Sequence, residues 1–339
     1  MDPLTQGTLG ALAAQSASSK ADLGKAALIG GLAAMTPDLD VLIRSSTDPV
    51  LALEYHRHFT HSLFYIPLGG LLAGLLLHGT LGRRWGLSMK LTLAFSMLGI
   101  ATHGLLDLCT SYGTSLLWPV SDLRLSLDLV SIIDPLVTLP LLLAVALARW
   151  RRSPRLAWVG LLWLFAYLFL GGLQQQRAES EMRAIAEARG HEPNHLRAMP
   201  SLGNLLVWRT VYESGGAFHV DAVGVGLGAG QHFPGASAEV ADLRRSWEIL
   251  PEGSQQLIDA QRFARFSQGY INFVPGSGRL KIGDIRYAPI PDELEPLWGI
   301  TLAPVPDPTA HVEVFMPYER DIGSLARLWA MVKQTANAE

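Results

Sequence analysis

Three histidines, His56, His58 and His61, fall within six residues, immediately before a long apolar stretch of the chain. Imidazole is the commonest metal ligand in proteins. A second pair, His103 and Asp107, is spaced i,i+4 within another apolar stretch, so a helix would place both side chains on one face. The residue types and their spacing therefore predict a metal centre built from histidine and aspartate.

Three more aspartates lie where they could join this centre. Asp38 and Asp40 end a short apolar segment, and Asp134 lies near one end of a third apolar stretch. Ionisable side chains in membrane segments are costly and usually mark functional sites. Mixed imidazole and carboxylate ligands suit Zn, Mn or Fe, and we interpret the single cysteine, Cys109, as a small apolar filler. Taken singly, Asp40 or Asp134 could be no more than a helix cap.

The composition is that of a membrane protein. Of the 339 residues, 49% are apolar and 17% are charged, whereas about 25% are charged in an ordinary soluble protein. The formal net charge of −3 gives no sign of nucleic-acid binding.

Apolar stretches predict the helices that must position the centre. Four of them approach or exceed the ~20 residues that a membrane-spanning helix needs. They are Leu63–Leu81, Leu87–Cys109, Leu129–Ala148 and Leu156–Leu173. Two shorter helices precede them, from Asp2 to about Ser18 and from Leu23 to about Met35. They could cross the membrane as a thin or tilted pair, or form a re-entrant hairpin. We therefore predict an all-α polytopic membrane bundle over residues 1–173.

The distribution of charge predicts the orientation of this bundle. Residues 1–173 hold 12 Lys and Arg residues, of which nine flank the turns at one end of the predicted helices. The nine are Lys20, Lys25, Arg83, Arg84, Lys90, Arg149, Arg151, Arg152 and Arg155. Because basic residues accumulate on the cytoplasmic side, the histidine stretch at the opposite end faces outward. The last helix then delivers residues 174–339 to that same outer side.

Residues 174–339 have a soluble composition, with 15 basic and 20 acidic residues. We predict an extracytoplasmic soluble α+β domain, which could also bind a protein partner. It opens with a polar helix over Gln174–Arg189 and closes with a helix over Asp321–Lys333. The expected strands are Leu205–Tyr212, Ala217–Val223, Tyr270–Val274, Lys281–Tyr287 and Ala310–Phe315.

One motif in this half is a decoy. His191-Glu192-Pro193-Asn194-His195 matches the zincin spacing H-E-x-x-H. That motif needs both histidines on one helical face, whereas Pro193 pushes the residue before it away from the helical conformation. We therefore do not predict a zincin protease.

Several motifs, taken in order, resemble the bacterial inner-membrane metal-dependent hydrolase family that includes LexA-binding, membrane-bound hydrolase-like proteins. The N-terminal motifs are Asp2–Gly7, Thr36–Asp40, His56–Ser62, His103-x-x-x-Asp107, Thr110-x-x-Gly113 and Leu117–Pro119. The C-terminal motifs Leu206–Arg209 and Gly283–Tyr287 are similar to those of its longer members.

This resemblance implies a hydrolytic activity and kinship with helical zinc-dependent phospholipases C. It implies that a divalent metal is held by Asp38, His56, His61, His103 and Asp107.

The chain departs from this family at Gln6, where members often carry histidine. Either the site has one ligand fewer, or Gln6 coordinates through its carbonyl oxygen. His58 could compensate.

We therefore expect a metal-dependent hydrolase acting on a phosphoester or lipid-like substrate at the outer face of the inner membrane. Zinc is the expected ion, with manganese or magnesium as alternatives. For catalysis we expect His56 as ligand or base, Arg57 to steady an anion and Asp40 to assist. Asp40, Asp134 and Thr60 are candidates to orient the ligands from behind.

Two other functions fit the same residues. A divalent-metal transporter would need ionisable residues through the full depth of the membrane, whereas here they gather at the outer end. A non-catalytic membrane scaffold with a structural metal is the third possibility.

Overall fold

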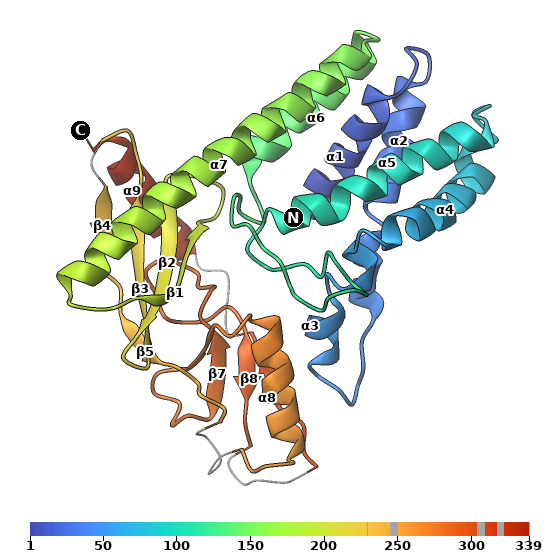
Figure 1. The fold of residues 1–339 in the computed structure, drawn as a ribbon. Helices are drawn as coiled ribbons and strands as arrows, with labels where there is room; N and C mark the ends of the chain where they lie inside the picture. The colour runs from blue at the N-terminus through green and yellow to red at the C-terminus, as the bar shows by residue number, and fades with distance from the viewer. Residues whose placement is uncertain (229, 245–249, 304–308, 317–321, 339) are drawn as a thin grey trace. The chain divides into compact units, whose positions relative to one another are not determined.

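The computed structural model describes residues 1–228, 230–244, 250–303, 309–316 and 322–338, which form two compact units (Figure 1). The first, here called the helical unit, comprises Met1–Ile43 and Tyr55–Gly171. The second, the C-terminal unit, comprises Arg44–Glu54 and Gly172–Glu339 and carries antiparallel sheets. The predicted fold class, a helical bundle followed by an α+β domain, is confirmed.

The helical unit begins with α1 (Pro3–Ser16) and α2 (Leu23–Ala34), which form a close pair. Asp2 caps α1 by accepting a hydrogen bond from the Thr5 N–H, and proline occupies the first turn, as the sequence predicts. A Cβ added to Gly30 on α2 would lie 2.5 Å from the Gly10 carbonyl oxygen, so glycine permits this close packing.

Three helices in the described part of the chain are long and apolar enough to cross a membrane. They are Tyr65–Gly82, Met89–Leu108 and Pro154–Ala188. The first consists of α4 (Tyr65–Leu77) and the π-helical turn η3 (His78–Gly82); the others are α5 and α7. Helix α7 has 35 residues and continues without a break into the predicted polar helix.

The predicted stretch Leu129–Ala148 begins too early. Its helix, α6, spans only Pro135–Trp150, an apolar helix of 16 residues. The Asp134 carboxylate accepts a hydrogen bond from the Leu136 N–H and Pro135 occupies the first helical position. These two residues determine where α6 begins, and the apolar residues before them do not extend the helix.

The C-terminal unit contains two antiparallel sheets among its described residues. The first has the order β1-β2-β3-β4 with β5 paired to β3, and the second has the order β6-β7-β8-β9. Their bounds are β1 Asn194–Pro200, β2 Val207–Ser214, β3 Ala217–Gly224, β4 Gln231–Phe233, β5 Ser237–Glu239, β6 Ile271–Phe273, β7 Lys281–Asp284, β8 Gly299–Thr301 and β9 Glu313–Phe315.

All five predicted strand regions contain a strand, whereas the strands β1, β4, β5 and β8 and helix α8 (Gln255–Phe266) are not anticipated. The closing helix is α9 (Ile322–Ala336); Asp321, where it was predicted to start, lies outside the described residues. The H-E-x-x-H motif lies on no helix, because His195 belongs to β1 and the residues before that strand are a loop. The prediction that this motif lacks the helical context of a zincin site is confirmed.

The two C-terminal motifs are buried scaffold. Arg209 on β2 donates hydrogen bonds to the carbonyl oxygens of Ile285, Pro291 and Glu293. Arg286 is buried against Asp284, with an Nη2–Oδ2 distance of 2.6 Å. Arg209 thus ties the first sheet to the segment that follows β7, and Arg286 pairs with Asp284 within the second sheet, because leaving buried carbonyls or carboxylates without a donor is costly.

Candidate metal centre

Four side-chain atoms in the helical unit converge on one point. The Nε2 atoms of His61 and His103 lie 2.9 Å apart. Asp38 Oδ1 lies 3.4 and 3.3 Å from these two nitrogens, and Asp107 Oδ2 lies 3.2 and 3.5 Å from them. Three different elements supply the four residues: η1 (Pro37–Leu42), η2 (Phe59–His61) and α5.

These spacings fit a tetrahedral divalent metal. Ligand bonds of about 2.0–2.1 Å separate tetrahedral ligand atoms by about 3.3 Å, and the five distances above range from 2.9 to 3.5 Å. Asp107 Oδ2 is buried and receives no directed hydrogen bond from its neighbours. The residues present therefore match the donor set of a zinc-type centre, and the four together could hold such an ion.

In each of the two histidine rings, the nitrogen that faces away from the converging atoms, Nδ1, is held by a hydrogen bond. His103 Nδ1 lies 2.5 Å from the carbonyl oxygen of Ala34 at the end of α2. His61 Nδ1 lies 3.0 Å from the Thr60 hydroxyl, which in turn donates to Asp40. Such bonds fix the tautomer and aim the Nε2 lone pair at the metal position.

Asp40 is buried and holds the histidine stretch together. Its Oδ2 accepts from the Arg57 backbone N–H at 2.9 Å and lies 3.3 Å from His61 Nδ1. Its Oδ1 lies 2.9 Å from His56 Nδ1. His56 is thus paired with Asp40 and lies outside the group of four, although Asp38, Asp40 and His56 form an adjoining group.

Arg57 lies behind Asp107. It adopts a left-handed backbone conformation with φ of 60°, and its Nε lies 3.3 Å from Asp107 Oδ2. Its Nη1 donates to the Thr110 hydroxyl, and its guanidinium stacks over the Tyr112 ring at 4.8 Å. These contacts orient a ligand carboxylate; a role toward a substrate anion stays a prediction.

Gln6 contacts the candidate ligand Asp107 through its amide nitrogen. It is fully buried, and its Nε2 donates to Asp107 Oδ1 at 3.0 Å and to the His103 carbonyl oxygen. The α-amino group of Met1 donates to the same Oδ1. Gln6 and Met1 thereby hold one oxygen of Asp107 and leave the other for a metal.

Two predicted residues are placed elsewhere. The His58 ring packs beside the rings of Tyr55 and Trp118, with centroids 5.4 and 5.8 Å away. Asp134 caps α6 and accepts a hydrogen bond from the Tyr167 hydroxyl at 2.8 Å. Neither lies in the converging group.

Burial and hydrogen bonding set the charges in the histidine stretch. Burial alone would raise the pKa of Asp38 and Asp40, but hydrogen bonds from His103, His61 and His56 outweigh it, so both pKa values lie below 3.8. Burial would lower the pKa of His61, but the carboxylates of Asp107, Asp38 and Asp40 raise it to about 10.

The Ala34 carbonyl and the Met1 amine are not anticipated from the sequence. Both are backbone groups, so no residue type marks them, and only the packing of α1, α2 and α5 brings them to the site.

Known proteins place the chain in a family. YfhP of Bacillus subtilis (strain 168), an uncharacterized protein, is 24% identical over 202 residues, which cover 58% of this chain and 59% of YfhP. The chain thus spans less than two thirds of the length of that relative. No solved structure matches. Residues 1–178, which include the whole candidate centre, match the family described as YdjM inner membrane protein. The chain therefore belongs to the YdjM inner membrane protein family.

Proposed function

We propose that this protein is a multi-pass, membrane-bound metal-dependent hydrolase whose centre faces the outer side of the inner membrane. The observation that carries the proposal is the set of four buried His and Asp atoms at tetrahedral spacing, with Nδ1 of both rings held. The resemblance to membrane-bound hydrolases supports the reaction class.

A divalent ion held by Asp38, His61, His103 and Asp107 would lower the pKa of a water and polarise the scissile group. Asp38 is the accessible side of the centre, since its side chain is 22% exposed and the other three are at most 1% exposed. His56 is our candidate general base. Asp40 holds its Nδ1, and its ring is 26% exposed, so Nε2 can accept a proton from an attacking water.

The substrate class follows from the proposed depth of the centre. Basic residues flank the helix turns at the end opposite to the histidine stretch, which supports an outward orientation. The helices α4, α5 and α7 are the candidate spans. A centre at their outer end would lie at the level of lipid headgroups, which favours an amphiphilic phosphoester over a freely soluble one.

The test combines metal analysis with a substrate panel. The full chain, purified in detergent, is expected to carry about one zinc per chain and to release phosphate or headgroup from at least one phospholipid or lipid-linked phosphate. His61→Ala and His103→Ala should each remove the metal and the activity. His78→Ala is the matched control, because the buried ring of His78 bonds to Thr92, which is not one of the four converging residues.

Metal-free wild type would refute the proposal, as would a His61→Ala or His103→Ala protein that retains both metal and activity. Two metals per chain would instead indicate that a second group also binds an ion, either Asp38, Asp40 and His56 or Asp48, Asp259 and His311.

One observation favours a second function. Four protein ligands complete a tetrahedron, and closed sites of this kind are usually structural. A scaffold with a structural metal would retain the ion, melt at lower temperature when a chelator removes it, and hydrolyse nothing in the panel. A hydrolase would instead need Asp38 to release the ion or the site to expand to five ligands.

A further inference from the structure

The segment 44–54 belongs to the C-terminal unit, although the residues on both sides of it belong to the helical unit. The element before it, η1, carries Asp38 and Asp40. Helix α3 (Leu51–Tyr55) begins within this segment, and His56 is the residue that follows the helix. Both ends of this segment therefore lead, within a few residues, to groups of the candidate metal centre.

An arginine of helix α8 binds this segment. Arg262 on α8 donates from Nη1 to Asp48 Oδ1 at 2.9 Å and from Nη2 to Glu54 Oε2 at 2.6 Å. Its Nε donates to the same Glu54 oxygen at 3.0 Å, and its Nη2 lies 2.9 Å from Asp48 Oδ2. The Arg262 side chain is 13% exposed, so solvent weakens these charge-assisted bonds less than on an open surface.

Asp48 links this ion pair to the start of α3. The same Oδ1 that contacts Arg262 accepts hydrogen bonds from the N–H groups of Val50 and Leu51. Val50 is fully buried. Arg262 therefore fixes the beginning of α3 through Asp48 and its last turn through Glu54.

Arg262 is itself held by the rest of the C-terminal unit. Asp259, one turn earlier on α8, is fully buried and lies 3.5 Å from Arg262 Nη1. Asp259 also accepts hydrogen bonds from the Val312 N–H and the Gln255 side chain, and it pairs with His311.

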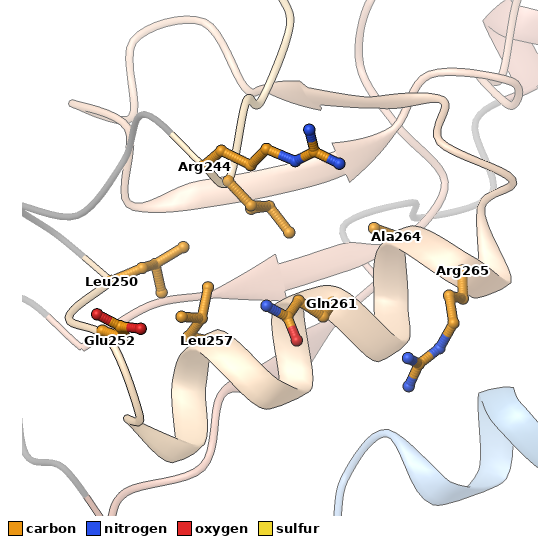
Figure 2. A pocket seen from close by; sticks show the side chains of 8 residues that line it. Arg244, Leu250, Glu252, Leu257, Gln261, Ala264 and Arg265 are labelled. Atoms are coloured by element: carbon orange, nitrogen blue, oxygen red, sulfur yellow. The ribbon is translucent and has the colours of Figure 1, made fainter.

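The other face of α8 is occupied differently. Leu257, Gln261, Ala264 and Arg265 line one side of a cavity of about 510 Å³ (Figure 2). The spacing of these residues places them opposite to Asp259 and Arg262 on the helix. One face of α8 therefore lines the cavity, and the opposite face, which carries Arg262, binds segment 44–54.

We propose that Arg262 is a positioning residue for the metal centre. By binding Asp48 and Glu54, it fixes the conformation of the segment that joins the Asp38–Asp40 turn to His56, and so the distance that this segment spans. The inference rests on the proposed metal-binding function and gives the C-terminal unit a role in it.

The test measures metal affinity in the full chain, purified in detergent, by competition between zinc and a chelator. Residues that orient metal ligands from outside typically contribute about 10–100-fold to affinity, so for the more remote Arg262→Met we expect a loss of about five- to tenfold. Arg262→Lys keeps the charge but not the fork of donors, and should lie in between. The visible spectrum of the cobalt-substituted protein should change in Arg262→Met, which a general loss of stability would not produce.

Arg327→Met is the matched control. Arg327 on α9 also binds two acids, Asp292 and Glu293, but neither lies in segment 44–54. It should leave affinity and spectrum unchanged. A double-mutant cycle with Glu54→Gln should show non-additive losses, because both changes break the same contact.

Each result has a separate meaning. Wild-type affinity in Arg262→Met, or additive losses in the cycle, would overturn this inference alone. A wild-type protein that binds no metal would overturn the proposed function and this inference with it. If Arg262→Met cannot be purified, the Arg262→Lys and Glu54→Gln proteins decide, and wild-type affinity in both would be contrary to the inference.

Discussion

His61 and His103 approach each other to 2.9 Å between their Nε2 atoms, although they are separated by 42 positions in the chain. One comes from the turn before α4 and the other from the C-terminal part of α5. The Nδ1 atom of each ring has a different partner. Thr60 and Asp40 contact that of His61, and the Ala34 carbonyl oxygen contacts that of His103. Changes in these partners should therefore affect metal binding without removing any ligand.

Asp40→Asn tests the partner of His61. The substitution keeps the shape of the side chain but removes the negative charge beside the imidazole ring. We expect zinc affinity to fall about 10–100-fold, measured by chelator competition. Asp134→Asn is the control, since asparagine caps a helix as well as aspartate does and Asp134 lies outside the converging group. Equal affinity in the two variants would contradict the role given to Asp40.

Gly99→Ala tests the packing beneath His103. A Cβ at Gly99 on α5 would collide with the Gly30 carbonyl oxygen on α2. One turn further along each helix, His103 meets the Ala34 carbonyl, so pushing α5 away from α2 should break that hydrogen bond. We expect at least about tenfold weaker zinc binding. Gly79→Ala, where an added Cβ meets nothing within 4 Å, should bind zinc as wild type does.

Asp221 on β3 should make the C-terminal unit sensitive to acid. Burial would raise its pKa, but hydrogen bonds from Arg189, the Gly235 N–H and His232 outweigh it and hold the pKa below 3.8. Its contribution to stability is therefore complete above pH 3.8 and is lost as the pH falls through the lowered folded value.

Asp221→Asn should accordingly lower the free energy of unfolding by about 2 kcal/mol at neutral pH and flatten the acid dependence of the melting temperature. Thermal melts of the full chain between pH 3 and pH 7 measure both effects. The exposed Glu252→Gln should leave the profile unchanged, and an unaltered acid dependence in Asp221→Asn would disprove this assignment.

A reporter enzyme fused after Glu339 tests the proposed orientation. A reporter that is active only in the periplasm should show activity when it is fused at this position, because α7 would run from the cytoplasmic to the outer side. A fusion in the turn after α6, near Arg152, should be inactive. The opposite pair of results would place the metal centre on the cytoplasmic side.

Sequence patterns anticipate the residues of the centre better than their partners. The i,i+4 spacing of His103 and Asp107 fixes their common face, because a helix leaves no alternative once the apolar stretch forms. That Gln6 would donate to Asp107 depends on how α1 packs against α5, a tertiary contact that no local pattern encodes. The same is true of Arg262 and segment 44–54, whose contact joins residues more than 200 positions apart.

The paired histidines would also couple metal binding to the release of a proton. The Ala34 carbonyl can only accept, so His103 Nδ1 carries a hydrogen, and His61 Nδ1 carries one toward Thr60, whose own proton goes to Asp40. The Nε2 lone pairs of the two rings then face each other at 2.9 Å. Either a proton or a metal ion can lie between these two nitrogens, but not both. Because the neighbouring carboxylates raise the pKa of His61 to about 10, entry of a metal ion would expel a proton at neutral pH. Metal affinity should then weaken about tenfold for each unit by which the surroundings acidify, which would couple the loading of this centre to the acidity of its compartment.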